Sequence, residues 1–182
     1  MTFHRPLANS SRFHGRVEEL HLSNIVVGLA LILLGTACSQ TPRTFSASVA
    51  NAGIDSLNAR ISQAYRDRDP SAYGALYTDS AVFEWPAFNT VRGRAGMEAM
   101  ARSNWASLSE MDLRLTVSTR RVEPDHATEI GAFEQSFRVS SGARMTEFGR
   151  YVALLARDAS AGWRIDRFFG FSDSTRTAPA AR

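Results

Sequence analysis

Residues 64–86 read AYRDRDPSAYGALYTDSAVFEWP, and this stretch decides the order of the elements around it. On its N-terminal side, apolar residues recur at steps of three and four, which predicts a first helix that ends near Asp67. Pro70 suits the first turn of a second, short helix, because its missing N–H is not needed there. Residues 77–80 are a predicted turn, and residues 81–85 are a predicted short strand that the following proline ends.

Further along the chain, the sequence VRGR at residues 91–94 leads into a third predicted helix, with Met97 and Trp105 on one face. The rest alternates between apolar and polar residues in four segments separated by turn residues, which predicts four strands. Helices followed by a long antiparallel meander indicate an α+β domain whose helices cover one face of the sheet. The four predicted strands are residues 112–122, 128–139, 145–157 and 163–171.

Composition excludes several classes of function. The 182 residues fit one domain plus an extension, and a hydrophobic share of 44% is enough for a core. The net charge is only +3, carried by arginines because lysine is absent, so there is no basic stripe and we expect no nucleic-acid partner. Beyond Cys38 there is no further cysteine, and the only histidine is His126. A zinc site of Cys and His ligands is therefore excluded there, and we expect no metal and no cofactor.

The N-terminal segment has the features of an export signal. Residues 25–34 (IVVGLALILL) are apolar and uncharged, but a membrane-spanning helix needs about 20 such residues. A basic start, a short apolar stretch and small residues before Cys38 are typical of a secretory signal peptide. The sequence LLGTAC also resembles a bacterial lipobox, in which the cysteine is lipidated. Gly35 stands where such motifs usually carry Leu, so cleavage as an ordinary signal peptide stays open, as does a buried or amphipathic helix.

These features predict four segments. Residues 1–38 are the expected signal peptide, residues 39–51 a flexible linker, residues 52–174 the folded domain and residues 175–182 a disordered tail. Lipidation of Cys38 would anchor the chain in the cell envelope, on the outer membrane or the periplasmic side in a Gram-negative cell. Membrane contact would then occur only through this N-terminus. The alternative is a soluble secreted or periplasmic protein.

Four sequence segments together resemble the SnoaL-like branch of the nuclear transport factor two-like superfamily, which includes ketosteroid isomerases. They are the stretch 64–86, VRGR, GRYVALLAR at 149–157 and GWRI at 162–165. The resemblance covers residues 52–173. It implies a cone, in which a strongly curved antiparallel sheet wraps around a pocket that three N-terminal helices close. This fold hosts enzymes, binding proteins and dimerisation modules, so it does not by itself define the function.

The resemblance also implies where the proton-transferring groups of a ketosteroid isomerase would lie. The position of the general base falls on Trp85, that of the oxyanion-hole tyrosine on Ile61, and that of its partner aspartate on about Ala153. An apolar residue stands at each position. Because base catalysis needs a titratable group within reach of the substrate, isomerisation by that mechanism is excluded.

Alternation along the strands predicts the lining of the pocket. The face that carries Ala153 also carries Tyr151 and Glu147, and a tight hairpin loop over residues 140–143 would bring Glu134 onto the same face. We therefore expect two carboxylates, Glu134 and Glu147, in a pocket walled by aromatic side chains. Each aromatic residue can alternatively be core packing, and each glutamate a solvated surface group. The expected aromatic wall is Tyr65, Trp85, Tyr151 and Phe168.

Three functions remain open. The leading one is the binding of a small apolar or aromatic molecule in the pocket, without established catalysis. The second is a cofactor-free acid/base enzyme (an isomerase, dehydratase, cyclase or hydrolase) that uses Glu134 or Glu147 with Tyr151. The third is a homodimeric association module, because the side chains expected on the outer face are apolar and need cover. That expected outer set is Phe133, Phe137, Phe148, Val152 and Leu154.

Overall fold

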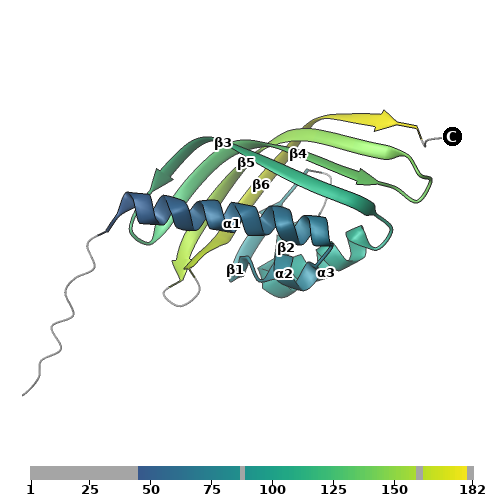
Figure 1. The fold of residues 1–182 in the computed structure, drawn as a ribbon. Helices are drawn as coiled ribbons and strands as arrows, with labels where there is room; N and C mark the ends of the chain where they lie inside the picture. Colours follow the sequence, from purple (N-terminus) through teal and green to yellow (C-terminus); the bar gives the residue numbers. More distant parts are fainter. Residues whose placement is uncertain (1–44, 87–88, 159–161, 180–182) are drawn as a thin grey trace, which may run out of the picture. The chain divides into compact units, whose positions relative to one another are not determined.

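The computed structural model describes residues 45–86, 89–158 and 162–179 (Figure 1). The predicted signal peptide with Cys38, and the predicted linker up to residue 44, lie outside the described residues. Within the described part of the chain, no helix is both long enough and apolar enough to cross a membrane. The elements are α1 (Ala47–Asp67), α2 (Pro70–Gly74), β1 (Tyr77–Glu84), β2 (Val91–Arg92), α3 (Gly93–Trp105), β3 (Ser109–Val122), β4 (His126–Arg138), β5 (Arg144–Asp158) and β6 (Gly162–Ala178).

The six strands form one sheet in the order β2-β1-β6-β5-β4-β3. Strands β3 to β6 are the predicted antiparallel meander. Strand β1, however, pairs with β6 in parallel, so the sheet is mixed rather than wholly antiparallel. The sequence did not indicate this pairing, because alternation within one strand reveals neither its partner nor its direction.

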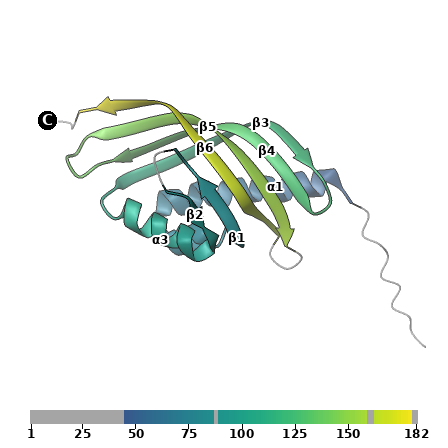
Figure 2. The same cartoon turned by 180° about the vertical axis from the view of Figure 1, so that it is seen from behind.

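The sheet is strongly curved, and the three helices lie on its concave side, as the resemblance implied (Figures 1 and 2). Helix α1 packs against β3 and β6, and α3 packs against β1. Register shifts interrupt the β3–β4 pairing near Val117 and the β5–β6 pairing near Phe148 and Leu154. Such irregularities bend and twist a strand locally, which accounts for part of the curvature.

Helix α1 is capped at both ends. It begins after Ser46, whose hydroxyl accepts the Val49 N–H. It ends at Asp67, and the capping residue Arg68 has a left-handed φ of 55° that lets the Asp69 N–H donate to the Ala64 carbonyl oxygen. The predicted end near Asp67 is confirmed.

Three predicted boundaries were wrong. Residues 47–51 belong to α1 rather than to a linker, and the side chain of Ala50 is buried in the core. Strand β1 begins at Tyr77, where a turn was predicted. Residues 175–178 pair with β5 instead of forming a disordered tail. These segments are rich in small and polar residues, so their regular structure comes from tertiary contacts that the sequence pattern does not indicate.

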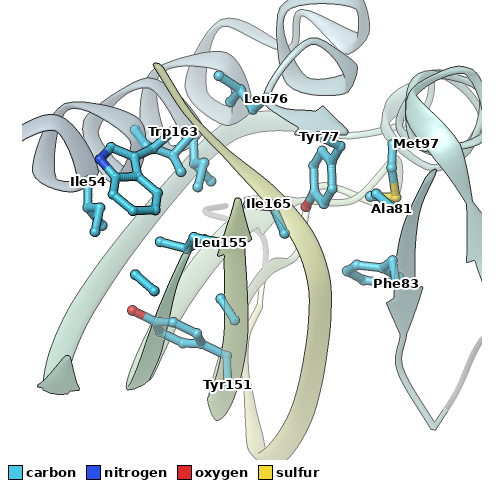
Figure 3. Packing of buried hydrophobic residues seen from close by; sticks show 14 of the residues in the cluster. Ile54, Leu76, Tyr77, Ala81, Phe83, Met97, Tyr151, Leu155, Trp163 and Ile165 are labelled. Atoms are coloured by element: carbon cyan, nitrogen blue, oxygen red, sulfur yellow. The ribbon is translucent and has the colours of Figure 1, made fainter. Parts of the chain in front are cut away.

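The core lies between α1 and the concave face of the sheet. Ile54 and Leu57 of α1 are completely buried, and the indole of Trp163 from β6 lies beside Ile54 (Figure 3). A Cβ atom at Gly53 would be only 2.8 Å from Trp163 Cδ1, so the glycine lets the indole approach the helix. Figure 3 shows the core continuing through Ile165 towards Phe83 of β1.

Candidate functional site

The helices and the concave face of the sheet enclose a cavity of about 390 Å³. Every element of the described residues except β2 contributes to its wall. The wall is mainly aromatic and aliphatic, with a few polar groups, a composition typical of small-molecule sites. Its aromatic members are Tyr65, Tyr73, Tyr77, Phe83, Trp85, Trp105, Phe133, Phe137, Tyr151 and Phe168. The four aromatic residues predicted from the sequence thus all lie on this wall.

Four of these rings form one nearly parallel row across β1, β6 and β5. Trp85 stacks on Phe83 with centroids 6.0 Å apart, Phe83 on Phe168 at 5.4 Å, and Phe168 on Tyr151 at 5.7 Å. The interplanar angles are 14°, 6° and 9°. Gly170 makes room for the row, because a Cβ atom there would clash with the Trp85 indole.

A second aromatic group lies where α1, α2 and α3 meet. The Trp105 ring lies 5.4 Å from Tyr65 and 5.1 Å from Tyr73, both in edge-to-face geometry. The Tyr77 hydroxyl donates to the Tyr73 hydroxyl at 2.9 Å. Burial raises the pKa of Tyr65, and the nearby Tyr73 and Glu147 raise it further. These hydroxyls are therefore held in their neutral form.

Glu147 lies on the cavity wall, as predicted. Its carboxylate accepts one hydrogen bond from Gln135 Nε2 at 2.5 Å and another from the Ser172 hydroxyl. Both donors are neutral, and among the described residues no arginine or histidine forms an ion pair with Glu147. The structure therefore places a carboxylate with only neutral partners beside the aromatic rings.

Glu134 does not reach the cavity, and its predicted place in the pocket was wrong. The Val139 N–H donates to the Ala143 carbonyl oxygen, which extends the β4–β5 pairing beyond Arg138 and Arg144 and leaves a hairpin loop of three residues, Ser140 to Gly142. Gly142 takes a φ of 84°. The odd number of loop residues shifts the predicted pairing by one residue, so that Gln135 rather than Ser136 lies opposite Glu147. Because neighbouring strand residues point to opposite faces, Glu134 is exposed on the outer face.

The same shift reverses two residues predicted for the outer face. Phe133 is 5% exposed, and both it and Phe137 line the cavity. Gly149 lies opposite Phe133 on β5, and a Cβ atom there would clash with the Phe133 ring. The outer apolar set is therefore smaller than predicted and keeps Phe148, Val152 and Leu154.

Glu129 is the site residue that the sequence did not reveal. It lies on the cavity wall, only 1% exposed, opposite Ala153. Its Oε1 accepts the Tyr151 hydroxyl at 2.7 Å and Asn58 Nδ2 at 2.8 Å. Arg120 Nε donates to its Oε2 at 2.7 Å, and Arg120 Nη2 forms an ion pair with the same oxygen at 2.7 Å. Glu129 lies on the inner face only in the observed β4–β5 register. The length of the hairpin loop sets that register, so it was the only feature of the sequence that could have indicated this position.

This buried network uses the Tyr151 hydroxyl as a donor to Glu129. Burial and that hydrogen bond both raise the pKa of Tyr151. Gly131 leaves room for the hydroxyl, because a Cβ atom there would lie 2.7 Å from it. The Tyr151 hydroxyl is therefore bonded to Glu129, whereas the acid/base hypothesis combined Tyr151 with Glu134 or Glu147.

The three positions that the family resemblance assigned to ketosteroid isomerase chemistry all lie on the cavity wall. Ile61, Trp85 and Ala153 present apolar side chains there. Among residues 45–86, 89–158 and 162–179, no group of three His, Cys, Asp or Glu side chains could hold a metal ion. His126 is exposed at the start of β4, where its Nδ1 lies 2.7 Å from an Asp125 oxygen.

Comparisons with known proteins agree with this architecture. Residues 48–168 match the model of the SnoaL-like domain family. Similar solved structures include a hexachlorocyclohexane dehydrochlorinase of type 2, which is 16% identical with a TM-score of 0.63 over 74% of this chain and 93% of that chain. A ketosteroid isomerase-like protein from Erwinia carotovora atroseptica is 20% identical, with a TM-score of 0.60 over 68% of this chain and 95% of that chain.

An NTF2-like protein with a cystatin-like fold from Novosphingobium aromaticivorans is 23% identical, with a TM-score of 0.60 over 70% of this chain and 84% of that chain. At these identities the likeness shows the fold alone. No curated protein matches the chain.

Proposed function

The chain belongs to the SnoaL-like domain family, and from this premise we propose that it binds a small aromatic or apolar molecule in its cavity. The fold of this family often binds small molecules or catalyses reactions on them. The observation that carries the proposal is the row of stacked rings from Trp85 to Tyr151 on the wall of a cavity of about 390 Å³.

The physics of the wall favours an aromatic ligand. Aromatic rings pack by offset stacking or edge to face, and each good pair contributes about 0.5–1.5 kcal/mol beyond the area it buries. The parallel rings of Phe168 and Tyr151 offer such contacts. Burial of the ligand's apolar surface adds about 25 cal/mol per Å² before the entropic cost of binding.

Thermal unfolding of the full chain with 2-naphthol tests this proposal. A ligand that binds only the folded state raises Tm with its concentration. Leu115→Trp, which fills part of the cavity from the inner face of β3, should abolish the rise. The matched control is Arg114→Trp, an exposed position on the same strand, and it should keep the rise. An unchanged Tm for 2-naphthol, or an equal rise in Leu115→Trp, would contradict the proposal.

Glu147 favours a second candidate function, proton transfer to or from the bound molecule. A general acid or base must lie within hydrogen-bond reach of its substrate, and Glu147 is the predicted carboxylate that lines the cavity. Liquid chromatography of candidate ligands incubated with the protein would detect turnover, including isomerisation, which leaves the mass unchanged. Turnover that Glu147→Gln abolishes and Glu134→Gln preserves supports this function, whereas turnover that survives Glu147→Gln contradicts it.

We propose that the chain is exported and anchored through a lipid on Cys38. The proposal rests on the residues before Cys38 in the sequence, which resemble a lipobox. Labelling with radioactive palmitate in a bacterial host tests it, because Cys38→Ala should remove the label. If the wild-type chain takes up no palmitate, or Cys38→Ala keeps the label, the anchor is ruled out.

We also propose a homodimer through the outer face of the sheet. Phe148 and Val152 are partly exposed there, and Leu154 and Phe171 are 39% and 45% exposed. Val152→Glu should give a folded monomer in sedimentation velocity at a concentration where the wild type is dimeric. A wild-type monomer, or a dimer that persists in Val152→Glu, would contradict the proposal.

A further inference from the structure

The cavity wall carries two acidic side chains, and only one of them has a cationic partner. Its acidic members are Glu129 and Glu147, and none of the wall residues among those described is an arginine or a histidine. Arg120 compensates Glu129 directly, with two nitrogens 2.7 Å from its Oε2. Glu147 has only Gln135 and Ser172 as partners. The cavity therefore carries one carboxylate that no described cation compensates.

From this charge and the rings around it, we infer that the molecule held in the cavity is a small organic cation, an ammonium group on an aromatic or compact apolar body. The inference rests on the proposed binding function and names the ligand class for the same site. The cation would lie between the Glu147 carboxylate and the aromatic faces.

Aromatic faces are suitable partners for such a cation. The negative face of an aromatic ring attracts an ammonium group within about 6 Å of its centroid, most strongly for Trp and then Tyr. Tyr65 and Trp105 lie on the same wall as Glu147. Tyr65 is close enough to Glu147 for that charge to raise its pKa, so the carboxylate and these rings converge on one region.

Desolvation favours a cation over a neutral or anionic ligand. A ligand that fills the cavity removes water from Glu147, and burial of a charge without a counter-charge is costly. A cation replaces the lost water with a direct electrostatic interaction, which is stronger in the low dielectric of a cavity. An anion would instead be repelled by the same carboxylate.

Three ligands of nearly equal shape test the inference. Benzyltrimethylammonium is the cation, neopentylbenzene its neutral isostere, and phenylacetate an anion of similar size. Titration of the full chain can be followed through the fluorescence of Trp85 and Trp105, which both line the cavity. We expect benzyltrimethylammonium to bind about tenfold more tightly than neopentylbenzene, and phenylacetate to bind more weakly than both.

Glu147→Gln keeps the shape of the side chain and should remove the preference, leaving the two isosteres within about twofold of each other. Glu134→Gln is the matched control, because Glu134 is exposed on the outer face of the neighbouring strand, and it should keep the tenfold ratio. Thermal unfolding of both variants checks that they fold. Equal affinities of the wild type for benzyltrimethylammonium and neopentylbenzene would overturn the inference that the ligand is a cation, and so would a preference that survives in folded Glu147→Gln. Either result would leave the proposed binding function intact. Binding of none of the three ligands would overturn both.

Discussion

Glu129 shows how a carboxylate can be kept inside a mainly apolar cavity. Its side chain is 1% exposed, and its Oε1 accepts two hydrogen bonds at 2.7–2.8 Å. Its Oε2 accepts one hydrogen bond from Arg120 Nε and forms an ion pair with Arg120 Nη2, both at 2.7 Å. Transfer of a charge from water to a protein interior costs several kcal/mol, which only good geometry and a full set of partners offset. The network joins Asn58 of α1, Arg120 of β3 and Tyr151 of β5, so it fixes the helix to the sheet at the cavity wall.

Loss of either member of the Arg120–Glu129 pair should therefore destabilise the fold. We expect Glu129→Gln and Arg120→Gln each to lower the free energy of unfolding by about 3 kcal/mol. Arg120→Gln leaves the buried Glu129 without a counter-charge, and Glu129→Gln leaves the largely buried Arg120 with only the exposed Asp55 as an ion-pair partner. The double variant should lose clearly less than the sum of the two, as urea unfolding would show. Asp55→Asn is the control: Asp55 bonds the same arginine but is 69% exposed, so its loss should cost less than about 1 kcal/mol. Additive losses would contradict the direct coupling.

At the scale of elements, the β4–β5 hairpin decides which residues line the cavity. Its three-residue loop ends with Gly142, whose φ of 84° is costly for any residue with a side chain. Three-residue hairpin loops characteristically end in this left-handed conformation. The loop therefore sets the register that places Phe133 and Gln135 inside and Glu134 outside.

Gly142→Val should destabilise the hairpin, because a β-branched residue strongly resists a positive φ. We expect a loss of about 1–3 kcal/mol in the free energy of unfolding. Gly142→Asn should lose less, since Asn tolerates the left-handed conformation. Ser141→Ala, next to it in the loop, is the control and should change the stability by less than about 0.5 kcal/mol. Urea unfolding measures all three, and equal losses in Val and Asn variants would refute the role of φ.

The hairpin also explains how far the sequence could predict the site. Helical spacing and strand alternation are local patterns, so they predicted the three helices, the meander and four of the aromatic residues of the wall. Alternation shows which residues of one strand share a face, but pairing across a loop depends on its exact length. An error of one residue in the loop length placed Glu134 on the cavity wall instead of Gln135, and it placed Glu129 on the outer face. The parallel pairing of β1 with β6 joins segments far apart in the chain, which no local pattern encodes.

At the scale of the whole molecule, three of the four tyrosines lie in the core and the fourth, Tyr73, packs against it. Tyr65, Tyr73, Tyr77 and Tyr151 are the four, and burial is the largest cause of a raised pKa at each. In the unfolded chain they should ionise near the ordinary value of about 10. Folding thus holds the phenols neutral at a pH where the unfolded chain loses protons.

This difference predicts how alkaline pH acts on stability. The folded pKa lies above the unfolded one, so the contribution of the tyrosines is fully present below pH of about 10 and is lost as the pH rises beyond it. We expect the tyrosinate absorbance to stay flat until the protein unfolds and then to rise in a single step together with the loss of circular dichroism. The chain in urea is the control and should titrate smoothly near pH 10. A gradual rise in the native state would show that one or more hydroxyls are accessible.

Of the strands that the structure describes, the one furthest along the chain lies inside the sheet. Strand β6 separates β1 from β5 and carries Phe168 and Ser172 of the cavity wall. While residues 162–178 are still missing from a nascent chain, β1 and β2 have no strand to pair with except each other. The wall of the cavity is then also incomplete. Completion of the six-stranded sheet must therefore wait until the ribosome has released this segment. A chain that remains open for that long can still be threaded through a secretion channel, as the proposed export would require.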